Sequence, residues 1–138
     1  MKKYFFCILL LSATMVFSQR GKTGDKTFAH RFPEDKFNRV SNASLTLINE
    51  VDHDIIVVIR DQEKKYIRHV YIRNMEQFTF EELPITRMYV QFKSKEFYFE
   101  DLERTPVNYA DKHTFNFFFD PTLEGNYFKI SEEEFFKP

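Results

Sequence analysis

The chain has 138 residues, a formal net charge of −1 and a single cysteine, and it holds 18 phenylalanines but no tryptophan. This length is enough for one domain with a sizeable core. The nearly balanced charge gives no electrostatic basis for binding nucleic acid or an anionic membrane, so neither is expected as a partner.

The first eighteen residues predict a cleavable signal peptide. Lys2 and Lys3 precede an almost wholly apolar run over 4–17, and Val16 and Ser18 stand at the −3 and −1 positions of a cleavage site. A short basic region, an apolar region and small cleavage-site residues are the signature of secretory targeting. The run is also shorter than the roughly 20 apolar residues of a membrane span.

The only cysteine, Cys7, lies inside this apolar run and not directly after a cleavage site, so no lipid anchor is expected. Cleavage removes it and leaves 138 − 18 = 120 residues without a thiol. An exported domain without disulfides must rely on its core, which abundant phenylalanine supports. We predict an exported protein, periplasmic or extracellular with the periplasm favoured, that keeps no membrane span after processing.

Three segments follow the signal peptide. Residues 19–42 begin with a polar, glycine-bearing stretch and predict an extended, partly disordered leader. Its phenylalanines leave open the alternative of a docking arm for a partner. Residues 43–131 predict the β domain, and residues 132–138 predict an acidic and aromatic tail that forms one helical turn or frays.

Alternating and β-branched runs separated by turn residues predict a single antiparallel β-sandwich of about 7–8 strands. The run at 55–60 lacks alternation, which is typical of a central strand covered on both faces. Residues 104–109 predict a loop, because Pro106 blocks strand pairing except at an edge. The candidate strands lie at 43–49, 55–60, 66–72, 77–80, 87–92, 95–100, 114–119 and 127–131.

One stretch within 66–92 carries a family resemblance. Its elements are Tyr71-Ile72, Phe78-Thr79-Phe80, Leu83-Pro84 and Tyr89-Val90-Gln91-Phe92. This order resembles the middle of prealbumin-like (transthyretin-like) β-sandwich modules, which include the carboxypeptidase regulatory-like domains of exported Bacteroidetes-type proteins. The resemblance implies a mostly non-catalytic module that serves as a spacer, a binding platform or an accessory subunit.

The first turn glycine of that family pattern is replaced near Met75. Glycine is the usual residue where a turn needs a positive φ. The replacement predicts either a differently shaped turn or Asn74 in the left-handed position.

No nucleophile elbow, phosphate loop or dinucleotide fingerprint occurs in the sequence, so neither an enzyme nor a cofactor is predicted. The densest group of possible metal ligands is Asp52, His53 and Asp54. Carboxylates beside a histidine can bind a divalent cation. A polar turn between two strands explains the same residues more simply, and we predict no metal site.

His69 alternates with Ile67 and Tyr71, which predicts that the three share one face and that His69 packs across strands. The tyrosines and arginines of this region favour a protein partner, because exposed aromatic residues mark interfaces and sugar platforms favour tryptophan. The candidate protein-binding residues are Tyr66, Arg68, Tyr71, Arg73, Arg87 and Tyr89.

We therefore predict a non-catalytic exported binding module that acts as an accessory or adaptor subunit of a cell-envelope protein complex. Two alternatives stay open. One is a periplasmic inhibitor or immunity-type protein that plugs the active site of a partner. The other is a module that binds a small ligand or a carbohydrate.

Overall fold

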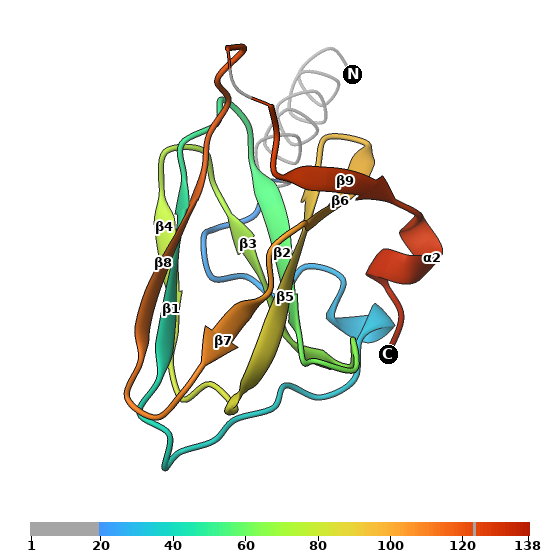
Figure 1. Ribbon diagram of the computed structural model, residues 1–138. Coiled ribbons are helices and arrows are strands. Elements are labelled where there is room, and N and C mark those ends of the chain that lie inside the picture. Colours follow the sequence, from blue (N-terminus) through green and yellow to red (C-terminus); the bar gives the residue numbers. More distant parts are fainter. Residues whose placement is uncertain (1–19, 123) are drawn as a thin grey trace, which may run out of the picture.

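The computed structural model describes residues 20–122 and 124–138, so the predicted signal peptide lies outside the described part of the chain. The predicted all-β sandwich is confirmed: nine described strands form two mostly antiparallel sheets (Figure 1). The elements are η1 (Ala29–Arg31), β1 (Ser44–Asn49), β2 (Ile55–Arg60), β3 (Tyr66–Ile72), β4 (Gln77–Phe80), β5 (Thr86–Ser94), β6 (Phe97–Asp101), β7 (Thr105–Val107), β8 (Lys112–Phe117), β9 (Tyr127–Ile130) and α2 (Glu132–Phe135).

The small sheet has the order β4-β1-β8, with β1 antiparallel to β4 and parallel to β8. The large sheet has the order β3-β2-β5-β6-β9, and β7 pairs with the first residues of β5. Strand β7 falls in the segment that the sequence predicts as a loop. Pro106 lies opposite Arg87 in this short strand, at a sheet edge, where a residue without an N–H is tolerated;.

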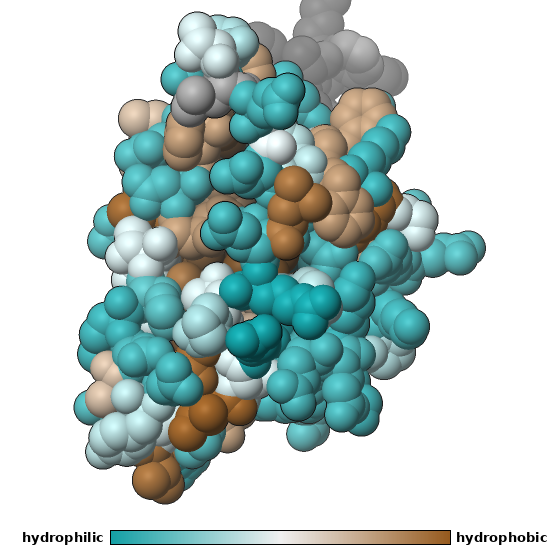
Figure 2. Space-filling view, in the orientation of Figure 1, coloured by the Kyte–Doolittle hydropathy of each residue, from teal (hydrophilic) through white to brown (hydrophobic). Residues whose placement is uncertain are grey.

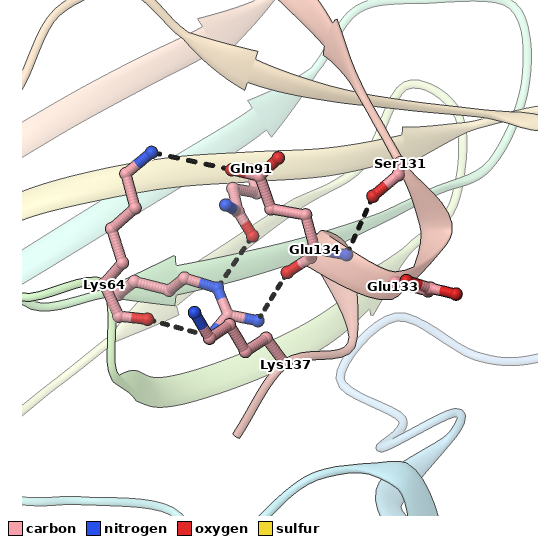
Figure 3. Close-up of a pocket in the computed structure, with 7 residues that line it drawn as sticks. Lys64, Gln91, Ser131, Glu133, Glu134 and Lys137 are labelled. Carbon is pink, nitrogen blue, oxygen red and sulfur yellow. Dashed lines mark hydrogen bonds and ion pairs between the residues drawn. The ribbon is translucent and has the colours of Figure 1, made fainter.

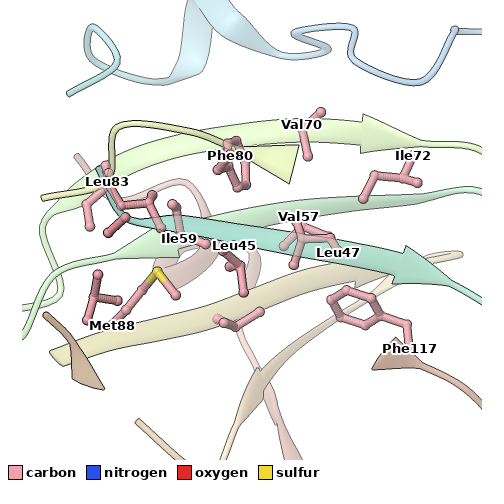
Figure 4. Close-up of a cluster of buried hydrophobic side chains, with 14 of the residues drawn as sticks. Leu45, Leu47, Val57, Ile59, Val70, Ile72, Phe80, Leu83, Met88 and Phe117 are labelled. Carbon is pink, nitrogen blue, oxygen red and sulfur yellow. The ribbon is translucent and has the colours of Figure 1, made fainter. Parts of the chain in front are cut away.

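The main core lies between the two sheets. Leu45 and Leu47 of β1 point toward Val57 and Ile59 of β2, and all four are at most 1% exposed (Figure 4). All six residues of β2 are buried, which confirms the prediction of a strand covered on both faces.

A second hydrophobic cluster lies on the outer face of the large sheet. Val58 of β2 is covered there by Phe135 and Phe136 of the tail, and Phe28 and Phe32 of the leader pack against the same cluster. Figure 1 shows the blue leader and the red α2 beside each other on this side of the sheet. The tail is therefore part of the packed domain, with α2 as its single helical turn.

The leader also differs from the extended, partly disordered segment that the sequence predicts. Its backbone pairs with β3: Gly24 N donates to Tyr71 O at 2.9 Å, and Tyr71 N donates to Asp25 O at 3.0 Å. Farther along, Lys36 N donates to Ile67 O at 2.9 Å. These bonds and the buried phenylalanine rings offset the entropy lost on ordering the segment. The leader thus covers one edge of the large sheet.

The predicted shared face of Ile67, His69 and Tyr71 is wrong for Ile67. The pairing of β2 with β3 shifts by one residue between Ile59 and Arg60, which marks a β-bulge. A bulge reverses the alternation on one side of it. Ile67 consequently belongs to the inner core, while Tyr71 belongs to the outer cluster.

The alternative of Asn74 in the left-handed position is wrong. Met75 itself takes the left-handed conformation, with φ of 61°, and Asn74 does not. Among the described residues, no helix has the length and apolar character needed to cross a membrane.

Candidate functional site

Four of the six predicted protein-binding residues contact the chain's own leader: Tyr66, Arg68, Tyr71 and Arg73. The Tyr66 hydroxyl donates to Asp35 Oδ1 at 2.7 Å, and the Arg68 guanidinium lies 4.4 Å from the centre of the Phe37 ring. Tyr66 is 1% exposed and Arg68 is 4% exposed. A partner reaches these two residues only after the leader leaves the sheet, so we do not place the partner site there.

The other two predicted residues stay accessible on the outer face of β5. Arg87 is exposed, and Tyr89 is half-buried. The Tyr89 ring has Lys64 Nζ at 4.9 Å and Arg104 Cζ at 5.0 Å from its centre. Both cations lie within cation–π distance of the ring, so the chain itself already uses part of this aromatic surface;.

The candidate metal ligands Asp52, His53 and Asp54 do not converge on one point. His53 Nδ1 lies 2.8 Å from Asp52 Oδ1, while Asp54 accepts two hydrogen bonds from Arg20, each of 2.9 Å. The bond from Arg20 is the main cause that holds the pKa of the Asp54 carboxyl well below its usual range. No three His, Cys, Asp or Glu side chains of the described ranges form a group able to hold a metal ion.

His69 fixes the leader to β3. It is 1% exposed, its Nδ1 lies 2.6 Å from the Tyr66 hydroxyl, and its Nε2 donates to Thr27 O at 2.8 Å. Lys26 Nζ donates to His69 O at 2.5 Å, which adds a contact between leader and strand, and it lies 2.7 Å from Asp35 Oδ2 within the leader. Burial is the largest cause that lowers the pKa of His69, and the nearby Lys26 charge lowers it further.

A partly exposed aromatic surface lies at the opposite side of the domain. The small sheet has three strands, and it covers the inner face of β3, β2 and β5 but leaves β6 and β9 overhanging. The rings on this overhang and beside it form what we call the open aromatic face, which consists of Phe92, Phe97, Phe99, Phe115 and Tyr127.

Three of these rings contact one another. The centre of the Phe92 ring lies 5.3 Å from that of Phe99 and 5.7 Å from that of Tyr127, and the last two are 5.2 Å apart. Phe117, which is 6% exposed, lies 5.2 Å from Phe92 and joins this surface to the core. The packing of the core rings therefore continues outward into rings that solvent reaches.

In Figure 2, apolar residues in brown and tan lie among hydrophilic ones over the part of the molecule that holds β6 and β9. Phe97 is 48% exposed and Tyr127 is 44% exposed. Lys129 Nζ lies 4.2 Å from the centre of the Phe97 ring at the rim of the surface. Contiguous exposed aromatic surface of this kind marks interaction sites on soluble proteins.

The sequence did not predict the open aromatic face, because its abundant phenylalanine was expected to support the core. The alternation of Phe97 and Phe99 on β6 was the available signal. It shows that these rings share a face, but it does not show whether another strand covers that face.

A second candidate site is a polar cavity of about 440 Å³ beside α2 (Figure 3). At its base, Arg60 Nε donates to Gln91 Oε1 at 2.7 Å, and Arg60 also donates to Phe135 O at 2.7 Å. These bonds tie the tail to the sheet. The cavity is lined by Arg60, Lys64, Gln91, Ser131, Glu133, Glu134 and Lys137.

Two buried polar atoms next to this base have no hydrogen-bond partner: Gln91 Nε2 and Glu100 Oε1. Their residues lie opposite each other on β5 and β6. Lys64 Nζ lies 3.1 Å from Glu100 Oε2 and 3.5 Å from Glu134 Oε1. Partial burial lowers the pKa of Lys64, but the two carboxylates outweigh it, so the pKa lies above its usual value.

No protein-family model matches this chain, and neither a curated protein nor a solved structure matches it.

Proposed function

We propose that this chain is an exported, non-catalytic protein-binding module that serves as an accessory or adaptor subunit in the cell envelope. The observation that carries the proposal is the open aromatic face. The leader and the tail cover part of the outer face of the large sheet, whereas Phe97 and Tyr127 on its inner face remain 48% and 44% exposed.

The arrangement of the rings favours a protein partner over a sugar. Tyr127 meets Phe99 at an angle of 77° and Phe92 at 76°, while Phe92 and Phe99 lie nearly parallel at 28°. Edge-to-face rings present an uneven apolar surface, into which aliphatic and aromatic side chains fit. A sugar platform needs a flat ring face, and Tyr127 stands edge-on against Phe92 and Phe99 and interrupts such a face. The Lys129 ammonium at the rim suits a carboxylate of the partner beside such an apolar anchor;.

The assignment to transthyretin-like modules belongs to the same proposal. It is supported by the two-sheet architecture and by the residues of 66–92 that carry the resemblance. The periplasm as the place of action is supported by the apolar run over 4–17 and the basic residues before it;.

The test is a mild-crosslinking pull-down of tagged protein from its native cell envelope, with mass spectrometry of the bound proteins. Wild type is compared with Phe97→Asp, which places a charge on the open aromatic face, and with Val40→Asp, at a distant site that is 79% exposed. We expect one dominant partner with wild type and Val40→Asp, and its loss with Phe97→Asp. Equal capture by all three proteins, or no enriched partner, contradicts the proposal. Melting curves verify that both variants fold.

A second candidate function is the binding of a small polar ligand in the cavity beside α2. The unpartnered Gln91 Nε2, which belongs to a fully buried residue, supports this candidate. A ligand that binds the native state raises the melting temperature. A thermal-shift screen of small zwitterions, with Lys137→Ala as the variant at the cavity mouth, tests it. A shift in wild type that shrinks in the variant supports the candidate, and a screen without shifts rejects it.

A further inference from the structure

We propose that β9 pairs antiparallel with β9 of a second copy of the chain and joins the two large sheets in a symmetric dimer. The leader covers the β3 edge of the large sheet, but no described strand pairs with the outer side of β9 at the other edge. An exposed strand edge with apolar side chains is a template for pairing with another chain. The proposal does not depend on the proposed function.

The backbone groups available for pairing follow from the contact of β9 with β6. Leu102 N donates to Asn126 O at 2.8 Å, so residue 126 turns its backbone groups toward β6. In an antiparallel pair the direction alternates with each residue. Phe128 therefore also faces β6, while Tyr127 and Lys129 direct their N–H and C=O groups outward.

The side chains select one register for a two-fold pairing. An axis perpendicular to the sheet through Phe128 sets each Tyr127 opposite Lys129 of the other copy. Each such pair exchanges two backbone hydrogen bonds. The same register places a lysine cation beside a tyrosine ring, which is attractive. The next register, centred on Lys129, sets two like charges opposite each other, which is unfavourable.

The other face of the strand agrees with this register. Phe128 is 43% exposed, and the two copies of its ring meet across the axis. Because the axis is perpendicular to the sheet, the open aromatic faces of both copies lie on the same side of the joined sheet. The strand has four residues, so the buried area is below that of a standard interface, and the dimer is weak and concentration-dependent;.

Disulfide trapping tests the register. The experiment uses single cysteines in the full chain with Cys7→Ser, so that the introduced thiol is unique. In the proposed register the two Phe128 Cα atoms form a non-hydrogen-bonded pair about 4.5 Å apart, a distance that a disulfide spans. Each Lys129 lies opposite Tyr127 of the other copy, two residues away from the other Lys129. The distance between the two Lys129 Cα atoms therefore exceeds the limit of about 7 Å that a disulfide can bridge.

We expect rapid covalent dimer formation by Phe128→Cys on mild oxidation, and slow formation by Lys129→Cys and by Met75→Cys, a control site that is 71% exposed. Equal rates for the three variants indicate random collision and overturn the proposal. Fastest trapping by Lys129→Cys overturns the register.

Sedimentation equilibrium provides the independent measurement. Wild type and Val40→Asp are expected to shift from monomer to dimer as the concentration rises. Phe128→Asp is expected to stay monomeric, because two carboxylates then oppose each other at the axis. A wild type that remains monomeric up to high micromolar concentration overturns the proposal. Capture of the envelope partner is measured separately, so the two proposals fail independently.

Discussion

Replacing Phe135 with alanine tests whether the tail belongs to the folded core. Phe135 is fully buried, and its ring centre lies 4.9 Å from that of Tyr98 and 5.0 Å from that of Phe136. A buried Phe→Ala substitution costs about 3–5 kcal/mol of the free energy of unfolding. We expect a loss of about 3 kcal/mol, the lower end of this range, because the tail can detach locally and so limits the loss.

The assay is chemical denaturation of wild type and variant, with Phe119→Ala as the matched control. Phe119 is 77% exposed, so its truncation should change the free energy of unfolding by no more than about 0.5 kcal/mol;. A loss below about 1 kcal/mol for Phe135→Ala, within the range of ordinary surface substitutions, refutes the reasoning. The outer cluster then contributes little to stability.

Two further outcomes follow from local geometry and from charge. Met75→Gly removes the strain of a side chain at φ of 61°. After the entropy cost of glycine, it should raise the free energy of unfolding by about 0.5–1 kcal/mol. A lower free energy of unfolding, measured by chemical denaturation, contradicts this. The pKa of His69 is lowered by burial, so the unfolded chain takes up its proton at a higher pH than the native chain does. Stability should therefore fall as the pH drops below about 6.5, and His69→Gln should flatten this dependence. Stability that rises in this range instead shows that a charged His69 completes the hydrogen bonds with Tyr66.

The strands could be predicted well because their patterns are local. The runs at 55–60, 66–72 and 77–80 have the same bounds in the structure as in the sequence prediction. β-branched and aromatic residues between turn residues determine such runs without help from distant contacts. The predicted face of Ile67 was wrong because of the β-bulge. A bulge depends on how β2 pairs with β3, and the sequence pattern of one strand does not show it.

The leader and the site could not be predicted, because both depend on contacts between distant residues. Tyr66 and Arg68 have the composition of an interface, and the structure shows that the interface is formed with residues 35 and 37 of the same chain. For the open aromatic face, alternation places Phe97 and Phe99 on one side of β6. Whether that side is covered depends on how many strands enter the small sheet, which the sequence does not reveal.

The central claim is that the open aromatic face binds a partner in the cell envelope, and site-specific photo-crosslinking tests it most directly. A benzophenone-bearing phenylalanine replaces Phe97, which conserves the aromatic ring, and in a second protein it replaces Val40. The proposed function predicts one discrete adduct with a distinct protein from position 97 and none from position 40. No adduct at position 97, or the same adducts at both positions, contradicts the claim.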